Sequence, residues 1–314
     1  MTGYLLRRLP SAFGVLLLAS FAIFLVLRAV PGDPAETLAG SDPSPAAVDA
    51  IRHDLGLDRP LLAQYASWLG HAVRGDFGRS YLIGGSVSDL LGQRIGNTVE
   101  LTLGALVFSV TLGLVLGVLG ATVKNRFGQT LLSAFNSVSL VVPGYVTGFV
   151  FVFLFAVTWQ VLPAGGHESI LADPQIGFQY VLMPALVLAL PVSAILSRYV
   201  KDGIEQALSE DYARTAKSLG VPPRRLLWRH ALPNALPPVL TALGMQIGVL
   251  LGGAVVIEAV FAWPGLGTLA EQAVTRRDYP VVQALLLFLV AVFVVVQLLT
   301  DIAYALLDPR VRLG

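Results

Sequence analysis

Six runs of about 20 apolar residues constrain this chain more than any other feature of its sequence. They cover residues 9–30, 99–123, 134–161, 180–200, 236–262 and 281–307. An α-helix rises about 1.5 Å per residue, so about 20 residues cross the ~30 Å hydrocarbon core of a bilayer. Because only 13% of the 314 residues are charged, few positions oppose such burial. The sequence therefore predicts an all-α membrane protein with six transmembrane helices.

Proline and glycine interrupt several of these runs. Pro143 and Gly144 fall inside the third run, Pro184 and Pro191 inside the fourth, and four glycines lie within residues 244–253 of the fifth. Proline removes a helical hydrogen bond, and glycine lets helix backbones approach closely. We expect a tightly packed bundle whose helices are kinked or broken at these positions.

The distribution of lysine and arginine predicts the orientation. Thirteen of the 21 basic residues fall at the amino terminus, between the second and third runs, from Arg198 at the end of the fourth run to Arg229, and after the sixth run. Such residues accumulate in cytoplasmic loops. We expect a multi-pass protein of the cytoplasmic (inner) membrane with both termini, within residues 1–30 and 308–314, in the cytoplasm. The length of the first run and its missing cleavage pattern favour a retained helix over a signal peptide.

A long segment, residues 31–98, separates the first two runs on the outer side. Ser44 and Pro45 are typical of a helix start, Gly56 of a helix end, and a second short helix is expected over residues 60–73. The segment is therefore predicted to be an extracytoplasmic helical insertion. Its apolar faces would pack on the membrane helices, on the membrane surface or on another protein.

The opposite side carries a polar segment, residues 201–235. Ser209 is expected to cap a helix that Gly220 ends, and Pro222 and Pro223 would start a second short basic helix. Three interpretations compete: a solvated basic loop, a DNA-binding helix-turn-helix, and a docking element for a cytoplasmic partner. A net charge of +1 and the immediate return to the membrane at Pro233 argue against nucleic acid as a partner.

Two stretches within that segment, "EDYARTAKSLG" at residues 210–220 and "RHALPNA" at residues 229–235, resemble the coupling motif of the membrane subunits of ATP-binding-cassette importers. Four residues match its consensus: Ala216, Gly220, Leu232 and Pro233. Three depart from it in the manner of the dipeptide and oligopeptide branch: Arg214, Thr215 and His230. Other stretches resemble the first, B-type permease of that branch: "VPGDP", "LGLDRPL", "GDFGRS", "FAWPGLG", "RRDYPVVQ" and "DPRVR".

The resemblance implies a type I importer fold with a core permease domain over residues 99–307. It implies import of di- and oligopeptides with four kinds of partner: the lipid bilayer, a sister permease in a heterodimer, two ATPases or one fused ATPase, and an extracytoplasmic substrate-binding protein. Nickel and glutathione importers share these motifs and are the alternative. It also implies that ATPase coupling uses Tyr212, Ala213, Arg214, Ala216, Lys217, Leu219, Gly220, Arg224, Arg225 and Arg229.

The remaining function classes find little support. The chain has no Gly-x-x-x-x-Gly-Lys-[Ser/Thr] motif, so ATP and Mg²⁺ are expected in the partner ATPases and no cofactor in this chain. There is no cysteine, and the four histidines are scattered, so no metal site is expected. A membrane-embedded enzyme would need a catalytic pair, and none is visible, so no catalytic residue is assigned. A passive channel would have no use for the polar segment.

Polar residues inside the runs are the candidates for a peptide path, which must be wide and weakly polar to accept many side chains. They are Ser109, Thr111, Asn136, Ser139, Ser193, Gln246 and Glu258. Each could instead hydrogen-bond a neighbouring helix. Glu100 and Glu258 are expected near the outer helix ends, within reach of headgroups or the outer mouth of the path, whereas Asp301 is expected to pair with an arginine or a helix end.

Overall fold

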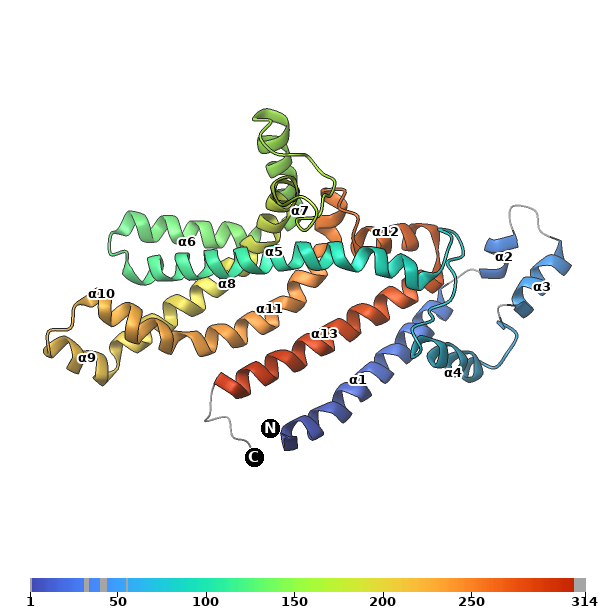
Figure 1. The fold of residues 1–314 in the computed structure, drawn as a ribbon, viewed down its shortest axis with the longest axis horizontal. Coiled ribbons are helices and arrows are strands. Elements are labelled where there is room, and N and C mark those ends of the chain that lie inside the picture. The colour runs from blue at the N-terminus through green and yellow to red at the C-terminus, as the bar shows by residue number, and fades with distance from the viewer. Residues whose placement is uncertain (1, 31–33, 40–43, 55, 308–314) are drawn as a thin grey trace. The chain divides into compact units, whose positions relative to one another are not determined.

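A computed structural model describes residues 2–30, 34–39, 44–54 and 56–307 (Figure 1). Five long helices are apolar enough to cross a membrane: α1 (Thr2–Ala29), α5 (Val87–Thr122), α8 (Pro174–Ser209), α11 (Leu232–Val260) and α13 (Tyr279–Leu307). Over these ranges the fold is helical, and its extended structure is one isolated bridge between Arg79 and Ser86. The all-α prediction is confirmed. Most of the "VPGDP" stretch and all of "DPRVR" lie outside the described residues.

The third predicted span is a bent pair of helices rather than one continuous helix. α6 (Arg126–Val141) and the continuous stretch of α7 (Gly144–Phe151) and the π-helix η1 (Val152–Thr158) meet at 108°. Pro143 lies at the break and forces the preceding residue, Val142, into an extended conformation. The break predicted at this position is confirmed, and a sixth span exists only if the bent pair counts as one. By contrast, α8 remains helical through Pro184 and Pro191.

Contacts divide the chain into two compact units, each described separately here. The second unit comprises residues 97–264 and 296–314, and its centre is α8, which packs against α6, α7 and α11. Asp173 starts α8 by accepting hydrogen bonds from the N–H groups of Gln175 and Ile176, both at 3.0 Å. A Cβ on Gly117 of α5 would lie 2.5 Å from Val200 Cβ of α8, so only glycine permits this approach.

The first unit comprises residues 1–96 and 265–295. It holds α1, α2 (Pro34–Ala39), α3 (Pro45–Asp54), α4 (Leu61–Ala72), α12 (Leu266–Arg276) and the adjoining ends of α5 and α13. The helices predicted in the outer insertion are confirmed, and Ser44 Oγ accepts a hydrogen bond from Ala47 N at 3.3 Å. α4 packs on α1 through Tyr65 and Trp68, whose rings lie 5.5 and 6.4 Å from that of Phe24. Of the three predicted alternatives for α4, the structure therefore shows packing on a membrane helix.

A buried carboxylate fixes the loop before α5. Asp278, between α12 and α13, accepts hydrogen bonds from the Ser80 hydroxyl at 2.5 Å and from the N–H groups of Tyr81, Leu82 and Ile83 at 3.0–3.2 Å. Asp278 is fully buried, so these four donors replace the water that an ionised carboxylate would otherwise bind. The stretches "GDFGRS" and "RRDYPVVQ" are thereby joined. The predicted bounds of the outer insertion, residues 31–98, stay predictions.

Candidate functional site

The polar segment between α8 and α11 forms a small helical projection, residues 210–231, which we call the knob. Glu210, and not Ser209, is the N-cap residue of α9 (Asp211–Ser218), so the expected cap by Ser209 is wrong. Ser209 is the last residue of α8 and donates its hydroxyl hydrogen to Gln206 O at 2.7 Å. α8 therefore extends nine residues, about two and a half turns, beyond the apolar run that ended at residue 200. Gly220 ends α9 with φ +78°, as its position predicted.

The second half of the knob continues into the membrane helix. α10 (Pro223–Leu226) passes through a π-helical turn, η2 (Leu227–Ala231), into α11, so that helix runs without interruption from Pro223 to Val260. The expected separate short helix before Pro233 is therefore wrong. Proline has no N–H to bond the preceding turn, and a wide π turn accommodates the lost hydrogen bond.

Buried side chains anchor the knob to the fold. They are Ala213, Leu226, Leu227 and Ala231. Asn234 Nδ2 also donates a hydrogen bond to the Tyr212 hydroxyl at 3.1 Å, and Arg214 lies 3.3 Å from Asp211 within α9. Of the predicted coupling residues, Ala213 thus faces the protein, whereas Tyr212 is exposed.

The outer surface of the knob combines apolar and cationic side chains. Leu219 is 79% exposed and Trp228 is 54% exposed. Five exposed basic residues accompany them: Arg214, Lys217, Arg224, Arg225 and Arg229. An exposed leucine and tryptophan with arginines nearby are typical of a protein-docking surface, because aromatic and arginine side chains dominate interface energies.

The predicted path residues occupy different environments. Ser109 and Ser193 are buried and donate hydrogen bonds to carbonyls of their own helices, Ala105 O at 2.7 Å and Leu190 O at 2.8 Å. Asn136 Nδ2 donates to Ser197 Oγ at 3.0 Å and lines a cavity of about 370 Å³. The others are half-buried or exposed: Thr111, Ser139 and Gln246. Their roles in transport stay predictions.

Glu258 does not reach solvent or headgroups. Its carboxylate is fully buried and accepts a hydrogen bond from the Thr98 hydroxyl at 2.6 Å, which joins α5 to α11. Its carbonyl accepts from Trp263 N at 2.8 Å. Glu258 therefore follows the second of the two interpretations given for these polar residues, hydrogen bonding to a neighbouring helix. The side chain of Asp301 lies outside the described residues.

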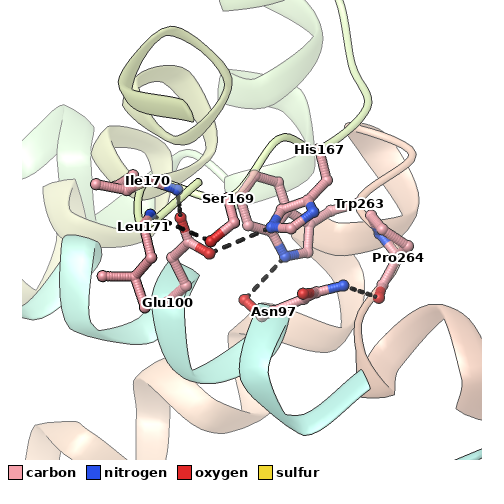
Figure 2. A network of polar contacts seen from close by, with 8 residues as sticks. All are labelled: Asn97, Glu100, His167, Ser169, Ile170, Leu171, Trp263 and Pro264. Carbon is pink, nitrogen blue, oxygen red and sulfur yellow. Dashed lines mark hydrogen bonds and ion pairs between the residues drawn. The ribbon is translucent and has the colours of Figure 1, made fainter. Parts of the chain in front are cut away.

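Glu100 belongs to a polar network that the sequence did not reveal (Figure 2). Its Oε1 accepts a hydrogen bond from Ile170 N at 2.7 Å, and its Oε2 lies 3.2 Å from His167 Nε2. The His167 ring meets the Trp263 ring edge-on, with centroids 4.5 Å apart. Trp263 Nε1 in turn donates to Asn97 O at 3.0 Å. Glu100 is partly exposed, and its expected reach to headgroups or to the outer mouth of the path stays a prediction.

Two family models match the chain. The model described as binding-protein-dependent transport system inner membrane component matches residues 110–313, and its amino-terminal companion matches residues 1–102. Within the described residues, no group of three His, Cys, Asp or Glu side chains could hold a metal ion.

Full-length relatives carry transport names. The chain is 38% identical over 312 residues to a protein of Sinorhizobium fredii described as a probable peptide ABC transporter permease, y4tP, covering 99% of this chain and 100% of that one. It is 35% identical over 312 residues to the Escherichia coli protein named glutathione transport system permease GsiC, covering 99% of both chains.

Solved structures share the fold. A chain of the MetNI methionine ABC transporter, in an inward-facing conformation, matches with a TM-score of 0.58 and 18% identity over 70% of this chain and 96% of that one. A chain of an amino acid ABC transporter crystallised with histidines matches with a TM-score of 0.51 and 20% identity, covering 71% and 95%. About 70% of the chain therefore shares the fold of these permease chains.

Proposed function

This chain belongs to the family of binding-protein-dependent transport system inner membrane components, and from that premise we propose that it forms one half of the membrane channel of an ATP-driven importer of short peptides. It is a multi-pass membrane permease subunit of an ABC importer, a transport component rather than an enzyme. Such a permease works with ATPases and a substrate-binding protein. The importer fold supports the transport role, and the names of the relatives support the peptide substrate.

The knob is the main structural support for coupling to the ATPases. Exposed Leu219 and Trp228, accompanied by arginines, suit insertion into a groove of an ATPase. The knob continues through η2 into α11, so a displacement at Trp228 would be carried along one helix from Pro223 to Val260. In this proposal ATP and Mg²⁺ bind only to the ATPases, and closure of those subunits moves the knob and opens the permease outward.

The orientation follows from the charges. We place residues 201–235 and both termini in the cytoplasm of the cell, because lysine and arginine accumulate in those segments. Residues 31–98 and the 261–267 turn then face outward and meet the binding protein. A sister permease would complete the membrane channel as a heterodimer, with two separate ATPases or one fused ATPase below it.

Glutathione is a second candidate substrate, because GsiC covers the chain at 35% identity. It is itself a tripeptide, so the two candidates differ in side-chain and linkage chemistry rather than in class. Nickel remains an alternative from the sequence resemblance alone. Peptide import is favoured because relatives with peptide names reach 38% identity.

ATP hydrolysis by the complete complex in lipid tests the proposal. The binding protein is added empty, or with dipeptides to pentapeptides, glutathione or nickel. We expect peptide-loaded binding protein to raise the hydrolysis rate several-fold above the rate with empty binding protein. Stimulation by nickel alone, or a rate indifferent to the binding protein, would overturn the peptide assignment.

A further inference from the structure

A cavity of about 550 Å³ lies within the first unit, outside the knob and the predicted path. Its walls come from α1, the end of α3, the α3–α4 connection, α4, the loop that follows α4, and the start of α13. A volume of this size lies within the range typical of small-molecule sites. Four aromatic side chains contribute apolar surface: Phe24, Trp68, Phe77 and Tyr81.

Charges of both signs line this cavity. Arg28, Arg59 and Arg79 supply guanidinium groups, and Asp54 and Asp76 supply carboxylates. Arginine binds a carboxylate through two parallel hydrogen bonds, whereas an ammonium group pairs with an aspartate or with an aromatic face. A ligand that carries one carboxylate and one ammonium group would therefore find partners for both ends.

Two glutamines of the cavity wall hold buried polar atoms without a hydrogen-bond partner among the described residues. Gln64 Oε1 is an unpaired acceptor, and Gln283 Nε2 is an unpaired donor. The orientation of Gln64 is fixed because its Nε2 donates to Leu57 O at 3.1 Å and to Arg59 O at 2.8 Å. Such orphaned groups are costly and indicate a missing partner. A peptide unit offers what they lack, one N–H for Gln64 and one C=O for Gln283.

We propose that this cavity binds the main chain of a short zwitterionic peptide, with its carboxylate on the arginines, its ammonium group on the aspartates and a peptide unit on Gln64 and Gln283. The site lies where the segment that we place outside the membrane meets the adjoining ends of α1 and α13, so it would hold peptide after release from the binding protein. This inference rests on the proposed peptide-import function and adds a site that belongs to this permease chain itself. A loop of the binding protein fits less well, because it brings no chain termini.

Calorimetric titration of the complete complex in lipid, without its binding protein, tests the site. The probes are tri-alanine, N-acetyl-tri-alanine and tri-alanine amide. We expect tri-alanine to bind and each capped peptide to bind at least tenfold more weakly. Arg59→Gln and Gln283→Glu should each weaken tri-alanine binding at least tenfold. Arg74→Gln is the matched control, since Arg74 is exposed in the same region but does not line the cavity, and its Kd should stay within twofold of wild type.

Several outcomes would overturn the site. They are no binding of tri-alanine, equal binding of capped and uncapped peptide, or wild-type affinity in both Arg59→Gln and Gln283→Glu. Competition by glycerophosphoethanolamine at concentrations equal to tri-alanine would instead identify a lipid headgroup as the occupant. The ATPase assay with loaded binding protein separates the two proposals. If peptide-loaded binding protein stimulates ATP hydrolysis but tri-alanine does not bind directly, only the proposed site is rejected. If ATP hydrolysis is not stimulated, the proposed peptide-import function is rejected.

Discussion

Thr98 donates its hydroxyl hydrogen to the buried carboxylate of Glu258 at 2.6 Å, across 160 residues of sequence. The bond joins α5 to α11 in a region where no water is expected to compete. A carboxylate at membrane depth is usually assigned to transport. Here its partner is a residue of a neighbouring helix, α5. The hydrogen bond attaches α5 to α11, the helix that continues into the knob.

The Thr98–Glu258 contact should appear as coupling in a double-mutant cycle. Thr98→Val and Glu258→Met each remove one side of this buried hydrogen bond, so the two changes together should destabilise less than the sum of their separate effects, by about 1–3 kcal/mol. The measurement is the free energy of unfolding in mixed micelles. Thr122→Val with Glu258→Met is the control cycle, since Thr122 lies 24 residues further along α5, about 36 Å from Thr98. Additivity in the first cycle would show that the hydrogen bond contributes nothing.

Leu219→Glu should abolish ATPase binding without lowering the stability of the permease. The side chain is 79% exposed, so the thermal stability of the permease should change by no more than about 0.5 kcal/mol. Co-purification with the ATPase and ATP-driven uptake should both be lost, because a charge would enter the docking groove. Leu171→Glu is the control, since Leu171 is 96% exposed outside the knob and its change should leave ATPase binding intact. Normal ATPase binding by Leu219→Glu would argue against the knob as the docking surface.

Substitution by alanine should lower the stability of the protein at Gly220 and raise it at Gly70. A Cβ at either position meets nothing within 4 Å, so only the backbone decides the outcome. Gly220 has φ +78°, and alanine there should destabilise by about 1–2 kcal/mol. Gly70 is helical within α4, and alanine should stabilise by about 0.5–1 kcal/mol. Thermal unfolding of both variants checks the pair, and a shift of the same sign in both would contradict the explanation.

Tyr81 should make stability depend on pH in the alkaline range. Burial raises its pKa above the ordinary value of 10.0, Arg28 lowers the pKa and Asp278 raises it. A raised pKa means that folding favours the neutral phenol, so this stabilisation is complete below pH 10 and is lost as the pH rises through the folded pKa. Between pH 9.5 and 11.5, an experimental range of roughly two units around the ordinary tyrosine pKa, Tm should therefore fall less steeply in Tyr81→Phe than in wild type. Equal slopes for wild type and Tyr81→Phe would rule out this contribution.

Local signals in the sequence predicted local structure well. Pro143 placed the break between α6 and α7, Ser44 the start of α3, and Gly220 the end of α9, because each acts through its own backbone or its nearest neighbours. Ser209 failed as a cap because the tertiary contacts of α8 extend the helix beyond its apolar run. The local signal there was weaker than the packing of the helix.

Long-range partners could not be read from the sequence. Glu258 lies two residues before the end of α11, as predicted, whereas Glu100 lies 13 residues after the start of α5 and not near its end. Their partners, Thr98 and His167, come from distant segments. The unpaired atoms of Gln64 and Gln283 are likewise visible only once α4 and α13 line one cavity. Pattern and spacing determine which groups are costly to bury, whereas the fold determines which group satisfies them.

The hydrogen bonds of Asp278 also set an order of events during synthesis. Ser80 leaves the ribosome 198 residues before Asp278. At about 5–20 residues per second, the loop that carries Ser80 waits about 10–40 s for its acceptor. Until then, water must satisfy the N–H groups of Tyr81 and Leu82, whereas Ile83 N–H also has Ser80 Oγ as an acceptor. The outer loop therefore reaches its final conformation only when the last membrane helix is being made, and a nascent chain arrested before residue 278 would leave it exposed to proteases.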